Sequence, residues 1–249
     1  MAQLVHRRVD HEWEAISLPS PDEHVIPGVP WGKVDQLFTP AFWATQAWLR
    51  QKELDHFYYK LGTTLHEEVA ACLLAGYGMP SEVGISAFRA LRLRGLLDGR
   101  PVSAEEIYEV LRYPFRLGSR SLTYRFAKQK SIYLSEYLRE VPFLNPPEAD
   151  PLAFRKWLLR FRGIGMKIAS WITRNWLESD SVAVIDVHVY RAGLLARLYS
   201  NDMVISRDYL SLERKYLEFA QAINVRASIL DCLIWTQMRQ AAWIPRRLM

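Results

Sequence analysis

The sequence predicts an all-α fold, and three observations carry that prediction. Apolar residues recur at helical spacing through most of the 249 residues. Helix-start signals precede several of these segments, as at Thr39-Pro40, where a capping threonine is followed by proline at the first helical position. Two of the helical patterns are joined only by Arg162-Gly163-Ile164-Gly165, a link that is too short for anything but a tight helical hairpin.

Prolines divide the chain into an N-terminal segment and two expected lobes. Residues 1–34 contain four prolines, which favours an extended segment lying on the surface. Three more prolines between residues 142 and 147 mark a loop between helical patterns. We therefore expect helical lobes over residues 35–145 and 146–249, with the N-terminal segment packed near the first.

Each helix is expected from its start signal and its apolar spacing. Capping boxes open two helices, at Thr64-Leu65-His66-Glu67 and at Ser103-Ala104-Glu105-Glu106. Asp186 is expected to cap another helix, because an aspartate at that position accepts hydrogen bonds from the first free amides. The expected helices cover residues 39–54, 64–75, 81–97, 103–111, a segment ending near 140, 152–161, 166–176, 186–198, 206–223 and 227–242.

Composition limits the partners that the protein can have. Lysine and arginine outnumber aspartate and glutamate by 32 to 27, and the net charge of +5 favours a polyanionic partner. Cys72 and Cys232 lie in apolar helical patterns without a C-x-x-C arrangement, so neither a disulfide framework nor a zinc site is expected. With no membrane-spanning apolar run and no signal-peptide pattern, we expect a cytoplasmic, nucleoid-associated protein with no metal, no cofactor and no membrane partner.

The short link between the two helices has features of a phosphate-binding hairpin. Gly163 and Gly165 permit positive φ and close approach of the backbone to another surface, while Ile164 between them can fill the space between the helices. The second helix then begins with unpaired amides and the positive end of its dipole. Lys167 lies in that first turn, and Asp186 follows 19 residues later, so an amine and a carboxylate are expected to face one cleft.

The motif Phe161-Arg162-Gly163-Ile164-Gly165-Met166-Lys167-Ile168-Ala169, followed by Ile185-Asp186-Val187-His188-Val189, resembles the signature of the helix-hairpin-helix DNA glycosylase superfamily. The lysine-to-aspartate spacing is similar to that of the 8-oxoguanine branch. The resemblance implies a two-lobed helical fold with the DNA cleft between the lobes. It also implies that Lys167 is the nucleophile, Asp186 the catalytic carboxylate and His188 a phosphate contact, while Gly163, Ile164 and Gly165 bind the DNA backbone.

Two other segments resemble DNA-contacting parts of the same superfamily. Tyr77, at the tip of a Gly-rich break between two helices, is the candidate for the wedge that fills the space of a flipped base, and a loop tyrosine that covers the core is the alternative. Glu82 stands where the eukaryotic enzymes have an arginine that reads the opposite cytosine, so the resemblance implies no opposite-base rule here. Arg125 and Lys128 match a Y-R-x-K-A-x-Y-L segment and are expected to contact phosphates, although a solvated helix face explains their charges equally well.

The implied base pocket contains two tryptophans and a carboxylate. Trp171 follows Lys167 by one turn, and Asp231 and Trp235 lie four residues apart on one face of the last helix. Asp231 can accept from an amino group, which guanine and cytosine have and thymine lacks. Core packing is the alternative for both tryptophans in a chain that has nine of them.

The resemblance therefore implies a monomeric base-excision DNA glycosylase with abasic-site lyase activity. Its partner would be double-stranded DNA containing a modified base, with 8-oxoguanine as the leading substrate. One alternative is a glycosylase for a modified cytosine, such as the glucosylated hydroxymethylcytosine of phage DNA. Another is a non-catalytic DNA-binding or damage-sensing protein that has kept the hairpin, since an aspartate cap and a first-turn lysine are each common structural features.

Overall fold

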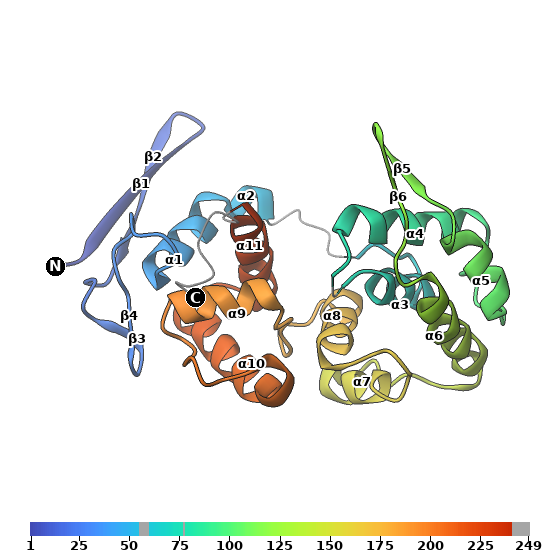
Figure 1. Cartoon of the computed structure of the whole chain (residues 1–249). Helices are drawn as coiled ribbons and strands as arrows, with labels where there is room; N and C mark the ends of the chain where they lie inside the picture. Colours follow the sequence, from blue (N-terminus) through green and yellow to red (C-terminus); the bar gives the residue numbers. More distant parts are fainter. Residues whose placement is uncertain (55–59, 77, 241–249) are drawn as a thin grey trace. The chain divides into compact units, whose positions relative to one another are not determined.

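The computed structural model describes residues 1–54, 60–76 and 78–240 (Figure 1). Within these residues the chain is mostly helical, as predicted, with eleven α-helices and three two-stranded hairpins. Contacts group the residues into two compact units. The terminal unit combines the described residues before position 55 with those from Asp180 onward, and the central unit contains the described residues from Lys60 to Ser179.

The terminal unit is a small helical bundle. Its last helix packs against three others, α1, α9 and α10, and large side chains such as Trp43, Tyr216 and Phe219 fill the space between them. The expected cap at Thr39 is confirmed, because its side chain accepts a hydrogen bond from the Phe42 amide at 3.1 Å. The helices of this unit are α1 (Pro40–Leu49), α2 (Gln51–Leu54), α9 (Val187–Leu195), α10 (Ile205–Ala222) and α11 (Ala227–Gln240).

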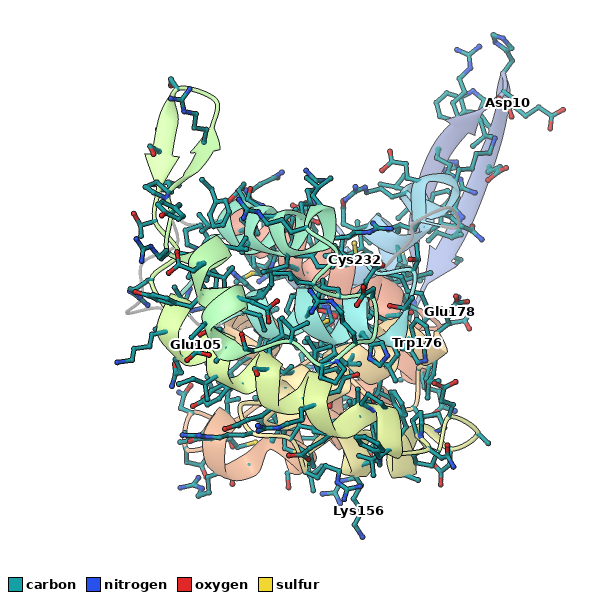
Figure 2. The ribbon with its side chains drawn as sticks, turned by 90° about the vertical axis from the view of Figure 1, so that its right-hand side faces the viewer. Asp10, Glu105, Lys156, Trp176, Glu178 and Cys232 are labelled. Carbon is teal, nitrogen blue, oxygen red and sulfur yellow. The ribbon has the colours of Figure 1, made fainter. Side chains whose placement is uncertain are left out.

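The N-terminal segment forms strands, which the sequence analysis did not predict. It pairs as two antiparallel hairpins, β1 (Gln3–Val9) with β2 (Glu12–Leu18), and β3 (His24–Ile26) with β4 (Val29–Pro30). Asp10, labelled in Figure 2 near the end of the first hairpin, has positive φ, as has His11, which suits a two-residue turn. The hairpin is held on its own unit by the Arg7 guanidinium over the Trp48 ring at 4.3 Å and by a 2.8 Å ion pair from Lys52 to Asp10.

The central unit is built around the buried helix α3. This helix packs against α4, α6 and α8, and one continuous apolar core runs from Leu65 to Ile172. The capping box at Ser103 is confirmed, with hydrogen bonds in both directions between Ser103 and Glu106. The elements are α3 (Leu65–Leu74), α4 (Ser81–Leu93), α5 (Ala104–Leu111), β5 (Phe115–Leu117), β6 (Arg120–Leu122), α6 (Ala127–Glu140), the 3-10 helix η1 (Val141–Phe143), α7 (Pro151–Leu158) and α8 (Met166–Leu177).

Two expectations about the organisation of the chain differ from the structure. The boundary expected between residues 145 and 146 does not separate the units, because Phe154, Phe161 and Ile172 from the hairpin region join the same core as α3. The capping box expected at Thr64 is only half formed. Thr64 accepts from the Glu67 amide at 3.3 Å, but the Glu67 carboxylate accepts from the amide and hydroxyl of Thr63 instead.

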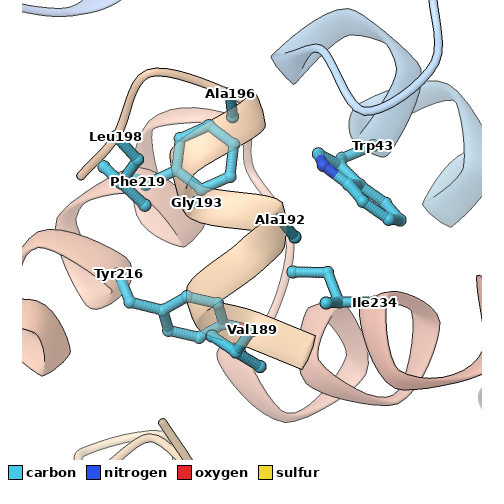
Figure 3. A pocket seen from close by; sticks show the side chains of 9 residues that line it. All are labelled: Trp43, Val189, Ala192, Gly193, Ala196, Leu198, Tyr216, Phe219 and Ile234. Carbon is cyan, nitrogen blue, oxygen red and sulfur yellow. The ribbon is translucent and has the colours of Figure 1, made fainter. Parts of the chain in front are cut away.

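Among the described helices, none has the length and apolar character needed to cross a bilayer. The terminal unit contains a small apolar gap lined by side chains of α1, α9, α10 and α11 and the turn after α9 (Figure 3). Trp43, Val189 and Ile234 are among its lining residues, and all three are buried. No charged side chain lines the gap, so it is a packing space of the core rather than a place for chemistry.

Candidate functional site

Helices α7 and α8 form the predicted helix-hairpin-helix in the central unit. Asp150 caps α7 by accepting from the amides of Leu152 and Ala153, at 2.8 and 3.2 Å. Ile164, in the link to α8, is buried in the apolar core, as expected for a side chain that fills the space between the helices. The buried Ile164 side chain therefore anchors the link to the core of the central unit.

The two glycines of the link have different roles. Gly163 has φ of 84°, and a Cβ built on it would come within 2.1 Å of the Tyr133 ring, so only glycine fits there. Gly165 has φ of −90° as the N-cap of α8, so the positive φ allowed for it by the sequence analysis is not used. A Cβ at Gly165 would meet no atom within 4 Å, so the surface in front of the first turn of α8 is open.

Lys167 lies in the first turn of α8, beside an aromatic ring. Its ammonium group is 5.4 Å from the centroid of the Trp171 ring, and both side chains are half-buried. Lys167 also lies near Cys72 of α3. Burial raises the pKa of the Cys72 thiol well above its ordinary value, and the charges of Arg174 and Lys167 act in the opposite direction.

Toward the end of α8, a buried polar network joins this helix to α3. The Glu68 carboxylate is 0% exposed and accepts from the amides of Leu61 and Gly62, both at 2.9 Å. Asn175 donates to the same carboxylate at 2.6 Å and accepts two hydrogen bonds from Arg174, at 3.1 and 2.9 Å. Sequence reasoning missed Glu68 and Asn175, because a carboxylate inside an apolar helix gives no local sign of its distant partner.

Asp186 caps α9 in the terminal unit, as predicted. Its Oδ1 accepts from the amides of His188 and Val189 at 2.8 and 2.9 Å, so Oδ2 takes no part in the cap. The buried run before it is fixed by Tyr209, whose hydroxyl donates to the carbonyl of Ala183 and accepts from the amide of Ile185. The carboxylate is half-buried and held at the start of the helix.

The structure brings together three of the expected site residues of the terminal unit. The rings of His188 on α9 and Trp235 on α11 meet edge to face, with centroids 6.4 Å apart. Asp231, one turn before Trp235, is buried at 6% exposure. The Arg239 guanidinium covers the Trp235 ring at 5.1 Å. This arrangement places a carboxylate, an imidazole and an indole on adjoining helices.

Near the expected wedge, the structure describes the turn but not its tip, since Tyr77 lies outside the described residues. Gly76 and Gly78 both have positive φ, and a Cβ on Gly78 would lie 2.5 Å from Nη2 of Arg125. Arg125 therefore packs directly against this turn, although 47 residues separate it from Gly78 in the sequence. Glu82 is exposed in the first turn of α4, and Lys128 is exposed in the first turn of α6.

A mostly helical fold, a glycine-linked helical hairpin followed by a lysine and an aspartate that caps a later helix define the class of helix-hairpin-helix proteins of the DNA glycosylase type. Residues 39–225 match the model of a family described as 8-oxoguanine DNA glycosylase, Ogg-HhH. The chain belongs to this family. The matched residues include Lys167 and Asp186, and they end before α11.

Individual relatives agree with the family match. A Saccharolobus islandicus protein (strain Y.N.15.51 / Yellowstone #2), named 8-oxoguanine DNA glycosylase/AP lyase, is 32% identical over 178 residues, which are 68% of this chain and 79% of that protein. A Methanocaldococcus jannaschii protein of the same name is 26% identical over 196 residues, covering 75% of this chain and 86% of the relative.

Solved structures show the same fold. The crystal structure of the 8-oxoguanine DNA glycosylase of Thermotoga maritima has a TM-score of 0.62 and 23% identity, covering 80% of this chain and 94% of that one. The Methanocaldococcus jannaschii 8-oxoguanine glycosylase/lyase in complex with a 15mer DNA containing 8-oxoguanine has a TM-score of 0.56 and 23% identity, covering 81% and 91%.

Proposed function

We propose that this protein is a DNA glycosylase with abasic-site lyase activity that removes 8-oxoguanine from double-stranded DNA. The observation that carries the proposal is Lys167 in the first turn of α8, directly after the glycine link, in a chain that belongs to the 8-oxoguanine DNA glycosylase family. A first-turn lysine is common by itself, but here it stands at the position that the resemblance to the 8-oxoguanine glycosylases assigns to the nucleophile.

Binding to the DNA backbone falls to the hairpin and to nearby cations. The open surface at Gly165 lets a phosphate approach the first amides of α8, where the helix dipole favours negative charge. Gly163 and Ile164 hold the link in the required shape. Arg125 and Lys128 add positive charge in the same unit, and His188 contributes a donor at the start of α9.

The chemistry follows from an amine and a carboxylate that act on one deoxyribose. Lys167 gives up a proton and attacks C1′ through Nζ, the bond from C1′ to the base breaks, and the departing base takes the bonding electrons and a proton. The ionised carboxylate of Asp186, with Oδ2 outside the helix cap, stabilises the positive charge that develops on the sugar. The sugar then opens to an iminium linked to Lys167, C2′ loses a proton, and the 3′ phosphate leaves by elimination.

The flipped base would be recognised by residues from α11 and α8. Asp231 accepts from an N–H group of the base, and Trp235 supplies an aromatic face whose position is fixed by His188 and Arg239. Trp171 lies beside Lys167 and would limit which bases fit. Tyr77 fills the space that the base has left in the duplex.

The test is covalent trapping with borohydride on duplexes that each contain one modified base. We expect an adduct and strand cleavage with the 8-oxoguanine duplex, no adduct with Lys167→Gln, and an undiminished adduct with Lys156→Gln, which removes an exposed lysine of α7. An adduct that survives in Lys167→Gln would overturn the role of Lys167. Cleavage of a modified-cytosine duplex alone would overturn the assignment of 8-oxoguanine as the substrate. Binding without cleavage of any duplex would overturn the assignment of the protein as an enzyme.

A further inference from the structure

One stretch of this chain before the helical hairpin carries a local excess of positive charge. Residues 112–130 contain six arginines and lysines and no aspartate or glutamate. Removing those six from the total of 32 basic residues leaves 26, against 27 acidic residues in the whole chain. The rest of the protein is therefore close to neutral in net charge, and this stretch carries a local positive charge that favours a polyanionic partner.

Part of the stretch is a short antiparallel hairpin, β5 and β6, inserted between α5 and α6. Leu117 pairs with Arg120 at its end, so the connection is the two residues Gly118 and Ser119. Gly118 has φ of 62° at the first turn position, which suits the tight turns that join twisted strands. Figure 1 shows the hairpin extending away from the helices of the central unit.

The hairpin is anchored at its base and polar toward its tip. Phe115 and Leu122 are paired across the strands, and both pack against the apolar core of the central unit. The next pair, Arg116 and Ser121, is exposed, and so is Arg120. A two-stranded ribbon in water is only marginally stable alone, so the packed base of this hairpin is what holds its exposed end in position.

The two hairpin arginines have no polar partner within the described part of the chain. Arg116 and Arg120 form no ion pair and no hydrogen bond with any residue that the structure describes. Other arginines of the central unit do have partners, as in the 2.9 Å pair from Arg92 to Glu67 and the 3.0 Å pair from Arg112 to Glu109. Exposed guanidinium groups without carboxylates nearby are available for an external anion.

We propose that β5–β6 is a DNA-binding arm, on which Arg116 and Arg120 contact phosphates of the duplex outside the catalytic residues. This rests on the proposed function only in that duplex DNA is the partner. Guanidinium groups bind phosphate oxygens with two parallel N–H donors, and the hydroxyls of Ser119 and Ser121 add neutral donors on the same arm. A two-stranded ribbon also has the width that a DNA groove admits. The arm raises affinity for any duplex, damaged or not.

The experiment measures the salt dependence of binding to a short undamaged duplex by fluorescence anisotropy. Each phosphate contact contributes about −0.9 to the slope of log K against log salt, so the double variant Arg116→Gln with Arg120→Gln should reduce the slope by about 1.8. It should bind weakly at low salt and approach the wild-type affinity as salt rises. Circular dichroism and thermal unfolding of the variant should match the wild type, because both side chains are exposed.

The matched control removes two other exposed cations of the same unit, Arg139→Gln with Lys156→Gln. Helix α7, which carries Lys156, lies at the opposite end of the central unit from the arm in Figure 1, and Lys156 is labelled at that end in Figure 2. If the slope of log K against log salt falls equally in the control and in the arm variant, the effect is one of general charge, and the proposed DNA-binding role of the arm is overturned. A loss confined to single-stranded DNA would overturn the duplex as its partner. Because the duplex is undamaged, neither result depends on whether Lys167 is catalytic.

Discussion

Asn175 on α8 donates a 2.6 Å hydrogen bond to the buried carboxylate of Glu68 on α3, across 107 residues of sequence. The bond ties the helix that carries Lys167 to the central helix of its unit. Glu68 is in turn held by two backbone amides from the segment before α3. The position of the proposed nucleophile therefore depends in part on a buried polar contact between two helices of the central unit.

Asn175→Ala is expected to destabilise the protein by about 1–3 kcal/mol, because it removes a donor from a buried charged acceptor. Urea unfolding followed by circular dichroism measures the change. Gln221→Ala, at an exposed position of α10, serves as the control and should stay within about 0.5 kcal/mol of the wild type. Equal stability of the two variants would mean that the bond from Asn175 to Glu68 contributes nothing.

Substitutions of Gly163 and Gly165 are expected to affect different properties, stability at Gly163 and DNA binding at Gly165. Gly163→Ala forces a Cβ against the Tyr133 ring at positive φ and should cost about 1–3 kcal/mol of stability. Gly165→Ser places a good capping residue where there is room, so stability should be kept or raised. In the proposed complex the same serine obstructs a phosphate, and DNA affinity should fall about tenfold, the value of roughly one charge-assisted hydrogen bond.

Thermal unfolding and anisotropy on the same two variants provide the measurement. Gly165→Ser with unchanged affinity would show that the backbone at this position does not approach DNA. Gly163→Ala with unchanged stability would show that the link can relax around the added methyl group.

Asp186 has a structural and a proposed chemical role, and two substitutions distinguish them. Asparagine caps helices as well as aspartate does, so Asp186→Asn should leave stability nearly unchanged while slowing excision at least about 100-fold through loss of the charge. Asp186→Ala should in addition cost about 1 kcal/mol by removing the cap. Single-turnover excision and thermal unfolding are the two measurements. If Asp186→Asn excises the base at the wild-type rate, Asp186 has only the structural role of capping α9.

Asp180 gives the terminal unit an acid-sensitive contact. Burial alone would raise the pKa of Asp180, but hydrogen bonds from Ser228 and Arg226, both at 2.8 Å, outweigh it and hold the pKa below its ordinary value of 3.8. Because the pKa is lower in the folded than in the unfolded state, this stabilisation is present above about pH 4 and is lost as the pH falls through the folded-state value.

Asp180→Asn should therefore lower stability at neutral pH and flatten the loss of stability in acid. Arg226→Gln should keep part of the stabilisation that Asp180 provides, because the amide of Ser228 still donates a hydrogen bond to its carboxylate. Unfolding free energies measured from neutral pH into acid test both. If the unfolding free energy of Asp180→Asn falls with decreasing pH as steeply as that of the wild type, other carboxylates cause the acid sensitivity.

Much of the fold and part of the site could be predicted from local signals. Helices follow from apolar spacing and from caps such as Thr39, Ser103 and Asp186, which act within one turn of the chain. The hairpin follows from two glycines in a link that is too short for any other connection. The strands of the N-terminal segment were missed, because prolines indicate extended chain without indicating which segment pairs with it.

By itself, the sequence determined the helices, the glycine-linked hairpin and the chemical types of Lys167 and Asp186. Only the tertiary structure decided that Glu68 anchors α8, that Arg125 packs on the turn at Gly78 and that His188 meets Trp235. The physical reason is the distance along the chain between the groups that interact. Caps and turns are satisfied by neighbours along the chain, whereas a buried carboxylate or an exposed ring acquires its partner only when distant segments pack together.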